Sequence, residues 1–330
     1  MTHSSGPGVL PGSGEMRARV ERHARETPLL PAPELSEQVG REVLLKAECL
    51  QVTGSFKVRG AAARLESLSE EERSAGIVAC SSGNHGRAVS YVAGRAGIAA
   101  RVFVPRWVDP VKLEGIRAGG AEAVLCGDTF DECEAAAIAA AERSGSVYVS
   151  AYDDPWVIAG QGTIGLEIAD QMGERPLAAV LVPLSGGGLV AGIAGALAER
   201  EVESSVVGVS ADRAAVMLAS VRAGRPVERP EEETLANALA GGIGLDNLYS
   251  FDMVRDRVHE HVSVSEEQIA EAMRFAVTRL RMVVEGGGAV ALAALLQGLW
   301  MPPRDGGAVV VVVSGGNVGG DTLVEILGAS

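Results

Sequence analysis

Residues 76–105, GIVACSSGNHGRAVSYVAGRAGIAARVFVP, decide the fold class of this 330-residue chain. An apolar run at 76–82 ends in a glycine turn, a helical stretch follows at 84–97, and a second apolar run follows at 100–105. Apolar runs that alternate with amphipathic stretches are typical of strands and helices in a parallel sheet. The stretch therefore predicts an α/β fold with a doubly wound parallel sheet.

The same alternation continues through most of the chain. Helices are expected at 111–120, 130–145, 160–173, 189–200 and 265–287, and strands at 121–127, 146–152, 178–188, 204–211 and 306–317. We expect two lobes: a small lobe over 55–150, and a large lobe made of 21–54 and 151–330. Residues 1–20 are rich in Gly, Pro and Ser and are expected to form a flexible tail.

Composition and charge exclude several classes of partner. Hydrophobic residues make up 47% of the chain, which is enough for a sizeable core. The formal net charge is -14 and there is no basic run, so neither nucleic acid nor an anionic membrane is expected as a partner. The apolar run Leu177–Ala198 is interrupted by Pro183 and three glycines, which favours a strand, a loop and a helix over a membrane span.

The four cysteines predict a reducing environment. None of them has CxxC spacing, and the chain is too long for a disulfide scaffold. We therefore expect free thiols, a cytoplasmic protein and no zinc site.

Three glycine-rich turns follow expected strands: SSGNHG (81–86), SGGGLVAG (185–192) and SGGN (314–317). Ligands of α/β sheets bind beyond the carboxyl ends of strands. Gly186, Gly187 and Gly188 can expose consecutive N–H groups in front of a helix, which favours a phosphate. The chain lacks the lysine of a P-loop and the fingerprint of a dinucleotide site, so neither ligand is indicated. Each turn taken alone is better explained as a tight strand-to-helix connection than as a ligand site.

A lysine in TGSFKVRGAA (53–62) is considered together with these turns, because the combination indicates a specific kind of site. Taken separately, Lys57 is explained as a solvated lysine, Asn84 as a helix cap, and Ser314 as a turn residue. No Ser-His-Asp order or paired carboxylates support a hydrolase. A phosphate cup, a hydroxyl at a strand end and a lysine beside an aromatic ring together describe a site for pyridoxal 5'-phosphate.

Six stretches then resemble one known family. TGSFKVRGAA, SSGNHGRAVSYVA, AGQGTIGLEI, SGGGLVAGIA, VVEGGGAVALAA and VVSGGNV are similar to motifs of the fold type II, pyridoxal-phosphate-dependent serine/threonine dehydratases and serine racemases. The resemblance runs from Thr27 to the C-terminus. It implies the fold of the tryptophan synthase β family, with two doubly wound lobes and the cofactor between them. It also implies a homodimer.

The resemblance assigns the cofactor site residue by residue. It implies that Lys57 forms the covalent link to the cofactor, that Phe56 packs against the pyridine ring, and that Asn84 binds the ring's phenolic oxygen. Ser314 would face the pyridine nitrogen, where a neutral hydroxyl favours β-elimination over transamination. The phosphate cup would be formed by Ser185, Gly186, Gly187, Gly188 and Leu189.

The resemblance also places the substrate. Its carboxylate would be held by the loop of Ser81, Ser82, Gly83, Asn84 and His85. In serine racemases, the serine at the place of Ser82 is the acid/base on the second face. The reaction implied is dehydration and deamination of a β-hydroxy amino acid, such as L-threonine or L-serine, to a 2-oxo acid and ammonia. Racemisation is the first alternative.

Two stretches depart from the family pattern. Relatives that bind a divalent cation carry carboxylates where this chain has Ser210 and Val216, so no metal ion is expected there. Relatives often read Asp-Gly where this chain has Asn237 and Ala238. That stretch looks closer to dehydratases of ectoine breakdown, whose substrate would be a hydroxylated or diamino acid. A C-terminal regulatory domain is not expected.

Other classes have less support. β-Replacing synthases resemble SVKDR, and threonine synthases read FKDRG, whereas Val58 follows the lysine here. A non-catalytic module would have no reason to keep Lys57, Asn84, the glycine cup and Ser314. A dinucleotide-dependent reductase is the weakest alternative, because its fingerprint is missing.

Overall fold

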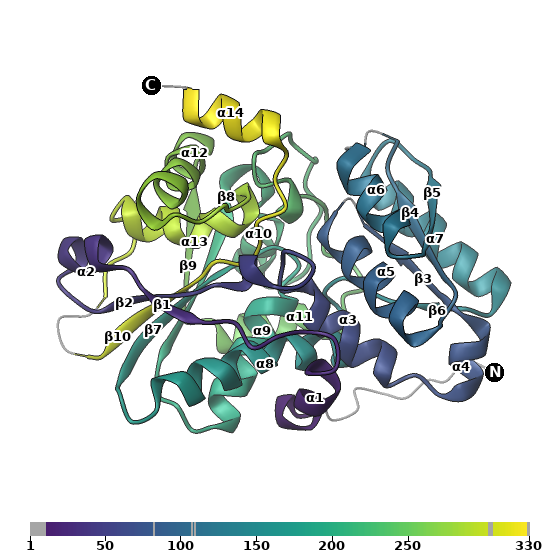
Figure 1. Cartoon of the computed structure of the whole chain (residues 1–330), viewed down its shortest axis with the longest axis horizontal. Coiled ribbons are helices and arrows are strands. Elements are labelled where there is room, and N and C mark those ends of the chain that lie inside the picture. The colour runs from purple at the N-terminus through teal and green to yellow at the C-terminus, as the bar shows by residue number, and fades with distance from the viewer. Residues whose placement is uncertain (1–10, 82, 107, 109, 303–305, 329–330) are drawn as a thin grey trace.

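Two sheets organise the computed structural model, which describes residues 11–81, 83–106, 108, 110–302 and 306–328 (Figure 1). The larger sheet has the strand order β1-β2-β10-β7-β8-β9 and the smaller one β5-β4-β3-β6. The described strand pairs are parallel, apart from β1 against β2. The α/β prediction with two parallel-sheet lobes is confirmed. The strands are β1 Leu29–Pro31, β2 Val43–Lys46, β3 Ile77–Cys80, β4 Ala100–Val104, β5 Glu122–Leu125, β6 Val147–Tyr148, β7 Leu177–Pro183, β8 Ser205–Ala211, β9 Glu260–Val264 and β10 Ala308–Val312.

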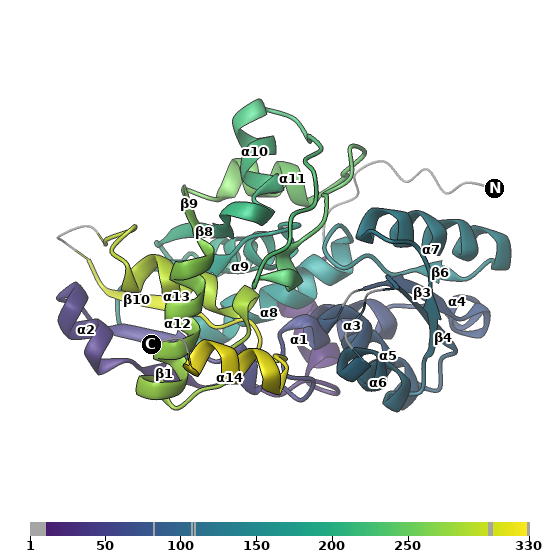
Figure 2. The same cartoon turned by 90° about the horizontal axis from the view of Figure 1, so that it is seen from above.

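The helices pack around these sheets (Figure 2). Helix α3 contacts both α8 of the large lobe and α5 of the small lobe. Because it packs against both lobes, its contacts do not decide to which lobe it belongs, and the lobe boundaries at 54/55 and 150/151 stay predictions. The helices are α1 Ser13–Val20, α2 Pro33–Val39, α3 Lys57–Glu66, α4 Glu70–Ala75, α5 Asn84–Ala96, α6 Pro110–Ala118, α7 Phe130–Ser144, α8 Pro155–Met172, α9 Gly188–Glu199, α10 Val216–Ala223, α11 Ser250–Arg257, α12 Glu266–Phe275, α13 Gly286–Leu296 and α14 Gly320–Gly328.

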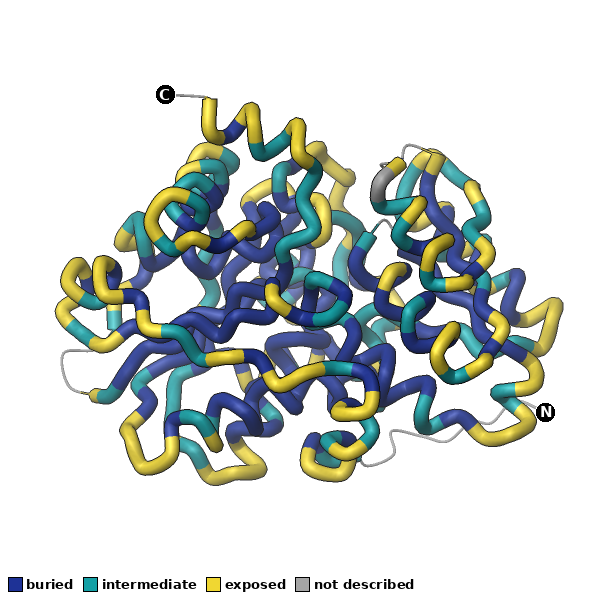
Figure 3. Tube along the Cα trace, in the orientation of Figure 1, coloured by how far each residue is buried: buried dark blue, intermediate teal, exposed yellow. Residues whose placement is uncertain are grey.

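The valine run of β10 shows why the larger sheet is covered on both faces. Val309 and Val311 belong to the apolar cluster that includes α13, whereas Val310 and Val312 belong to the cluster that includes α9. Successive side chains of a strand point to opposite faces, so an unbroken apolar run needs helices on both sides. Figure 3 shows the resulting buried interior and the exposed outer turns of the helices.

The expectation of a flexible tail over 1–20 is wrong for Ser13–Val20, which form α1. Met16 and Val20, one helical turn apart, are buried in a small cluster with Ala63 and Ala159. The composition of residues 1–20 does not indicate this helix, because the apolar residues that bury it belong to α3 and α8. Residues 1–10 lie outside the described part of the chain.

The single long helix expected at 265–287 is also wrong. Helix α12 ends at Phe275, a π-helical turn covers Ala276–Leu280, and Arg281 then takes a left-handed conformation with φ 60°. Residues 281–285 have no regular secondary structure, and α13 begins at Gly286. A π-helical turn and a left-handed residue both disrupt the regular hydrogen-bond ladder, so the helix stops.

The apolar run Leu177–Ala198 folds as predicted, into β7, a glycine turn and most of α9. Among the described residues, no helix is both long and apolar enough to cross a membrane.

Candidate active site

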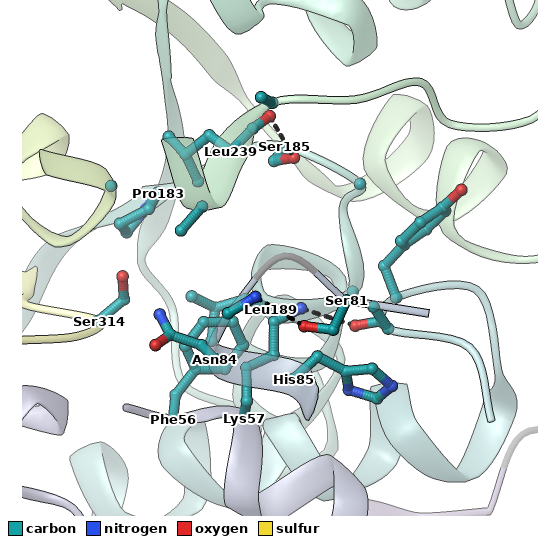
Figure 4. A pocket seen from close by; sticks show the side chains of 18 of the residues that line it. Phe56, Lys57, Ser81, Asn84, His85, Pro183, Ser185, Leu189, Leu239 and Ser314 are labelled. Carbon is teal, nitrogen blue, oxygen red and sulfur yellow. Dashed lines mark hydrogen bonds between the residues drawn. The ribbon is translucent and has the colours of Figure 1, made fainter. Parts of the chain in front are cut away.

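One cavity gathers the three glycine-rich turns that the sequence singled out. The turns after β3, β7 and β10 meet at the carboxyl ends of their strands, together with the start of α3 (Figure 4). The cavity has an empty volume of about 960 Å³, which includes space open to solvent. Its lining includes every described residue of the predicted cofactor and substrate sites. Ser82 lies outside the described residues, so its predicted role is untested.

The turn between β7 and α9 has the shape of a phosphate cup. Gly187 has φ +88°, a left-handed conformation that favours glycine. A Cβ at Gly186 would lie 2.3 Å from the Tyr152 ring, and one at Gly188 would lie 2.7 Å from the Tyr152 carbonyl oxygen. The turn therefore has no room for side chains at Gly186 and Gly188. The first residues of α9 line the cavity, where their free N–H groups could bind an anion.

Two further cup residues fix the turn itself. The Ser185 hydroxyl donates a 2.8 Å hydrogen bond to the carbonyl oxygen of Leu239. Leu189 is buried in the apolar cluster on the α9 side of the sheet.

Lys57 is the first residue of α3, and its Nζ donates a 2.7 Å hydrogen bond to the Ala151 carbonyl oxygen. Burial lowers the pKa of Lys57 to about 8. Nζ lies 5.1 Å from the centre of the Phe56 ring. Phe56 N–H in turn donates a 3.0 Å hydrogen bond to the Ser314 carbonyl oxygen, so the segment before α3 is joined to the strand end that carries Ser314.

The Asn84 amide is held in one orientation by two partners. Asn317 Nδ2 donates to Asn84 Oδ1 at 2.7 Å and to the Thr53 carbonyl oxygen at 2.9 Å. Asn84 Nδ2 donates to Glu285 Oε1 at 2.5 Å. The Thr53 carbonyl oxygen can only accept a hydrogen bond, so the atom of Asn317 that faces it must be the amide nitrogen. The same nitrogen donates to Asn84, so the atom of Asn84 that faces it must be the amide oxygen. One N–H of Asn84 is left for a ligand in the cavity.

Glu285 is a site residue that the sequence analysis missed. Its side chain is 5% exposed, and burial raises its pKa to about 7, although the bond from Asn84 acts in the opposite direction. The motif VVEGGGAVALAA contains this residue, but the sequence analysis placed it inside a helix expected at 265–287 and did not assign it to the site. The Glu285 N–H donates to the Gly315 carbonyl oxygen at 3.1 Å, and the chain enters the cavity at this point.

Two side chains of the predicted substrate loop form hydrogen bonds within the protein. Ser81 Oγ accepts a 3.0 Å hydrogen bond from the Gly83 N–H. Burial and the nearby Lys57 lower the pKa of His85 to about 3, so its ring is neutral and donates from Nε2 to the Val149 carbonyl oxygen at 3.0 Å. The N–H groups of Asn84 and His85 begin α5, where a carboxylate is favoured.

These residues fit pyridoxal phosphate. The cup suits the phosphate, Lys57 suits the covalent link, and Asn84 offers an N–H to the phenolic oxygen. Ser314 is 4% exposed, and Figure 4 shows its hydroxyl facing the same space as Asn84. The roles of the individual residues stay predictions.

Comparisons with known proteins agree with this geometry. The family model described as "Pyridoxal-phosphate dependent enzyme" matches residues 20–315. The chain belongs to this family. It is 39% identical to the L-threonine ammonia-lyase of Thermotoga maritima, over 95% of this chain and 76% of the relative. The solved threonine deaminase isoform 2 of Solanum lycopersicum is 32% identical, with a TM-score of 0.85 over 94% of this chain and 90% of that one.

A third relative represents the racemases. The solved serine racemase of maize has a TM-score of 0.87 and 30% identity, covering 95% of this chain and 94% of that one. The chain thus lies in the threonine dehydratase and serine racemase branch of the family.

The two positions that lack carboxylates have other partners. Ser210 Oγ donates to the Leu184 carbonyl oxygen at 2.9 Å, and Val216 is buried in an apolar cluster. In the part of the chain that the structure describes, no three His, Cys, Asp or Glu side chains gather as metal ligands. The expected absence of a metal ion stays a prediction.

Proposed function

We propose that the protein is an L-threonine ammonia-lyase, which converts L-threonine to 2-oxobutyrate and ammonia with L-serine as a second substrate. The observation that carries this proposal is the meeting of Lys57, Asn84, Ser314 and the glycine cup around one cavity. The activities for which the relatives are named support it, since this chain covers most of their length. Bound pyridoxal phosphate would supply an electron sink for the bonds at Cα of the substrate.

The side chains of the cavity then divide the remaining work. The amine of Lys57, with its pKa lowered to about 8, is suited to accept the proton from Cα. The N-terminus of α5 holds the substrate carboxylate. Loss of the β-hydroxyl as water leaves an enamine, which tautomerises and is hydrolysed to the 2-oxo acid and ammonia.

Apolar side chains at the cavity support a substrate with a methyl group. Phe130, Ala238 and Leu239 line the cavity beside the polar loop. Their surface would bury the β-methyl of threonine, and burying one methyl group contributes about 0.8 kcal/mol. L-threonine is therefore expected to have a lower KM than L-serine. A specialised acid of ectoine breakdown stays a hypothesis, motivated by Asn237 and Ala238.

The deciding experiment measures ammonia and 2-oxo acid released from L-threonine and L-serine by the purified protein with pyridoxal phosphate. Lys57→Ala is the blank. Release that is lost in the blank supports the proposal. No release from either amino acid, together with a normal cofactor band in visible absorbance, rejects these substrates while keeping the site. Release only from a hydroxylated or diamino acid would favour the ectoine hypothesis.

Racemisation is the second candidate, favoured by the likeness to maize serine racemase. Chiral chromatography of the same reactions tests it. D-serine formed faster than pyruvate from L-serine would make the racemase the principal activity.

A homodimer and a cytoplasmic location complete the proposal. Leu50 and Val283 are 47% and 50% exposed. Their chain segments approach each other, because a Cβ at Gly316 would meet both the Val283 carbonyl oxygen and the side chain of Cys49, the residue before Leu50. Exposed apolar side chains on neighbouring segments are consistent with an interface. The four cysteines are free thiols, which suits a reducing compartment. Light scattering that gives the mass of one chain would reject the dimer.

A further inference from the structure

Four charged side chains are buried together beneath α3. Lys46, Glu48, Arg59 and Glu167 are all less than 10% exposed, and we call them the buried quartet. Two cations face two carboxylates, so the charges balance. Burying ions costs free energy even when they are paired, and such a group is weak evidence for stability. The proposed chemistry does not use these residues, which raises the question of what they do.

Arg59 is the centre of the buried quartet. Its Nε and Nη2 donate to the two carboxylate oxygens of Glu48, both at 2.8 Å. Its Nη1 and Nη2 donate to the two oxygens of Glu167 at 2.5 and 2.8 Å. Burial opposes the charge, but the two carboxylates outweigh it and keep the pKa of Arg59 above its ordinary value. A planar guanidinium held by two forks has a fixed orientation as well as a fixed position.

The partners of Arg59 belong to the frame of the large lobe. Glu48 lies just after β2, and Glu167 lies on α8. Lys46 ends β2, pairs with Val312 of β10, and donates from Nζ to Glu167 at 2.6 Å. Strand β10 leads directly to Ser314. The buried quartet therefore joins α3 to the same strand ends that hold the predicted cofactor contacts.

Lys57 and Arg59 lie on the same helix but on opposite sides. Two residues along an α-helix correspond to a rotation of about 200°. Lys57 lines the cavity, while Arg59 is 1% exposed among its carboxylate partners. The hydrogen bond from Phe56 N–H to Ser314 fixes where α3 starts, and the guanidinium fixes its rotation. We propose that Arg59 is a positioning residue that sets the direction of Lys57 Nζ.

A purely structural role would make Arg59 equivalent to other buried cations of α3. Arg64 provides the comparison, since it lies on the same helix and is 9% exposed. Its Nε lies 3.1 Å from Asp154 Oδ2, and its guanidinium stacks 4.9 Å from the Trp156 ring centre. Both arginines join α3 to the segment 154–167, but Arg64 lies two turns from Lys57. Only Arg59 is expected to affect Lys57.

The test compares the holoenzyme variants Arg59→Lys and Arg64→Lys, each of which keeps the charge and loses the planar fork. Thermal unfolding, kcat and KM for L-threonine, and the pH titration of the visible cofactor band are measured. Both variants are expected to unfold at lower temperature. Arg59→Lys is expected to lower kcat at least about tenfold with KM changed less than about threefold, and to move the midpoint of the band titration. Arg64→Lys is expected to leave kcat and the titration unchanged.

Two outcomes would overturn the proposal: a normal kcat and titration in Arg59→Lys, or equal changes in both variants. If Arg59→Lys does not fold, Glu167→Gln removes one fork partner with little change of shape and is measured in its place. Its kcat is expected to fall at least about threefold, again with a moved titration midpoint, and unchanged values reject the proposal.

The inference rests on the role proposed for Lys57. A wild-type protein without a cofactor band and without 2-oxo acid release would reject the proposed function itself. An active wild type, together with an Arg59→Lys variant whose kcat and band titration are unchanged, would reject only the positioning role.

Discussion

Replacing Glu285 by glutamine should change how the stability of the protein depends on pH. Burial raises the pKa of Glu285 from 4.5 to about 7 in the folded chain. Between these values, the folded protein keeps a proton that the unfolded chain has released. The unfolding free energy contributed by this carboxyl therefore falls as pH rises through this window and is constant above it. Glutamine has the same shape, can still accept the bond from Asn84 Nδ2, and does not titrate.

The size of the effect follows from the two pKa values. Their difference of about 2.5, at about 1.4 kcal/mol for each pKa unit, corresponds to roughly 3 to 4 kcal/mol over the whole window. Most of the window lies between about pH 5 and about pH 8, where the change is roughly 2 to 3 kcal/mol. The Gln variant should gain this much stability relative to the wild type between those two pH values.

The assay is urea unfolding of the cofactor-free wild type and variant at several pH values across this range. Titrating groups that do not interact with Glu285 cancel in the difference, because both proteins share them. Lys57, whose pKa the charged form of Glu285 raises, contributes mainly at the alkaline end of the range. Glu122→Gln, which removes an exposed carboxyl on β5, is the control. A stability difference for Glu285→Gln that does not vary with pH would show that the Glu285 carboxyl ionises as it does in water, and would refute the reasoning.

Three further outcomes are expected. Gly187→Ala should weaken pyridoxal phosphate binding at least about tenfold in a spectral titration, because φ is +88° and a Cβ would lie 2.8 Å from an apolar side chain. Gly195→Ala, inside the helix that follows, would place a Cβ 3.9 Å from its nearest neighbour and should bind normally. Ser314→Asp should lower kcat for elimination at least about tenfold and increase half-transamination, seen as loss of the cofactor band during turnover. Asn237→Asp turns the 3.0 Å hydrogen bond from Lys112 into an exposed ion pair, so KM for L-threonine should change less than about fivefold.

Much of the fold could be predicted because its signals are local. The strand β10 is a run of valines, and such a run is stable only where helices cover both faces of a sheet. The glycines of the predicted phosphate cup indicated a turn with exposed N–H groups, and the structure shows why side chains would not fit there: the ring and carbonyl group of Tyr152 lie too close to Gly186 and Gly188. Both features could be recognised from a few consecutive residues.

The parts that could not be predicted depend on partners far away in the chain. Helix α1 is stabilised by residues of α3 and α8, and nothing within its own composition indicates burial. Lys46 and Glu48 look like surface charges in the sequence, yet both are fully buried because Arg59 and Glu167 neutralise them. The orientation of Asn84 depends on Asn317, which is 233 positions away.

The chemistry of Lys57 also depends on the folded cavity and not on the residue type. Burial acts in opposite directions on the two ionisable groups, lowering the pKa of Lys57 to about 8 and raising that of Glu285 to about 7. In both cases the neutral form is favoured, because a low-dielectric site disfavours charge of either sign. A fall from 10.5 to about 8 increases the neutral fraction of the lysine near pH 7 by roughly three hundredfold. Since only the neutral amine can attack a carbonyl or accept a proton, the burial of Lys57 is the physical step that would suit this lysine to the role proposed for it.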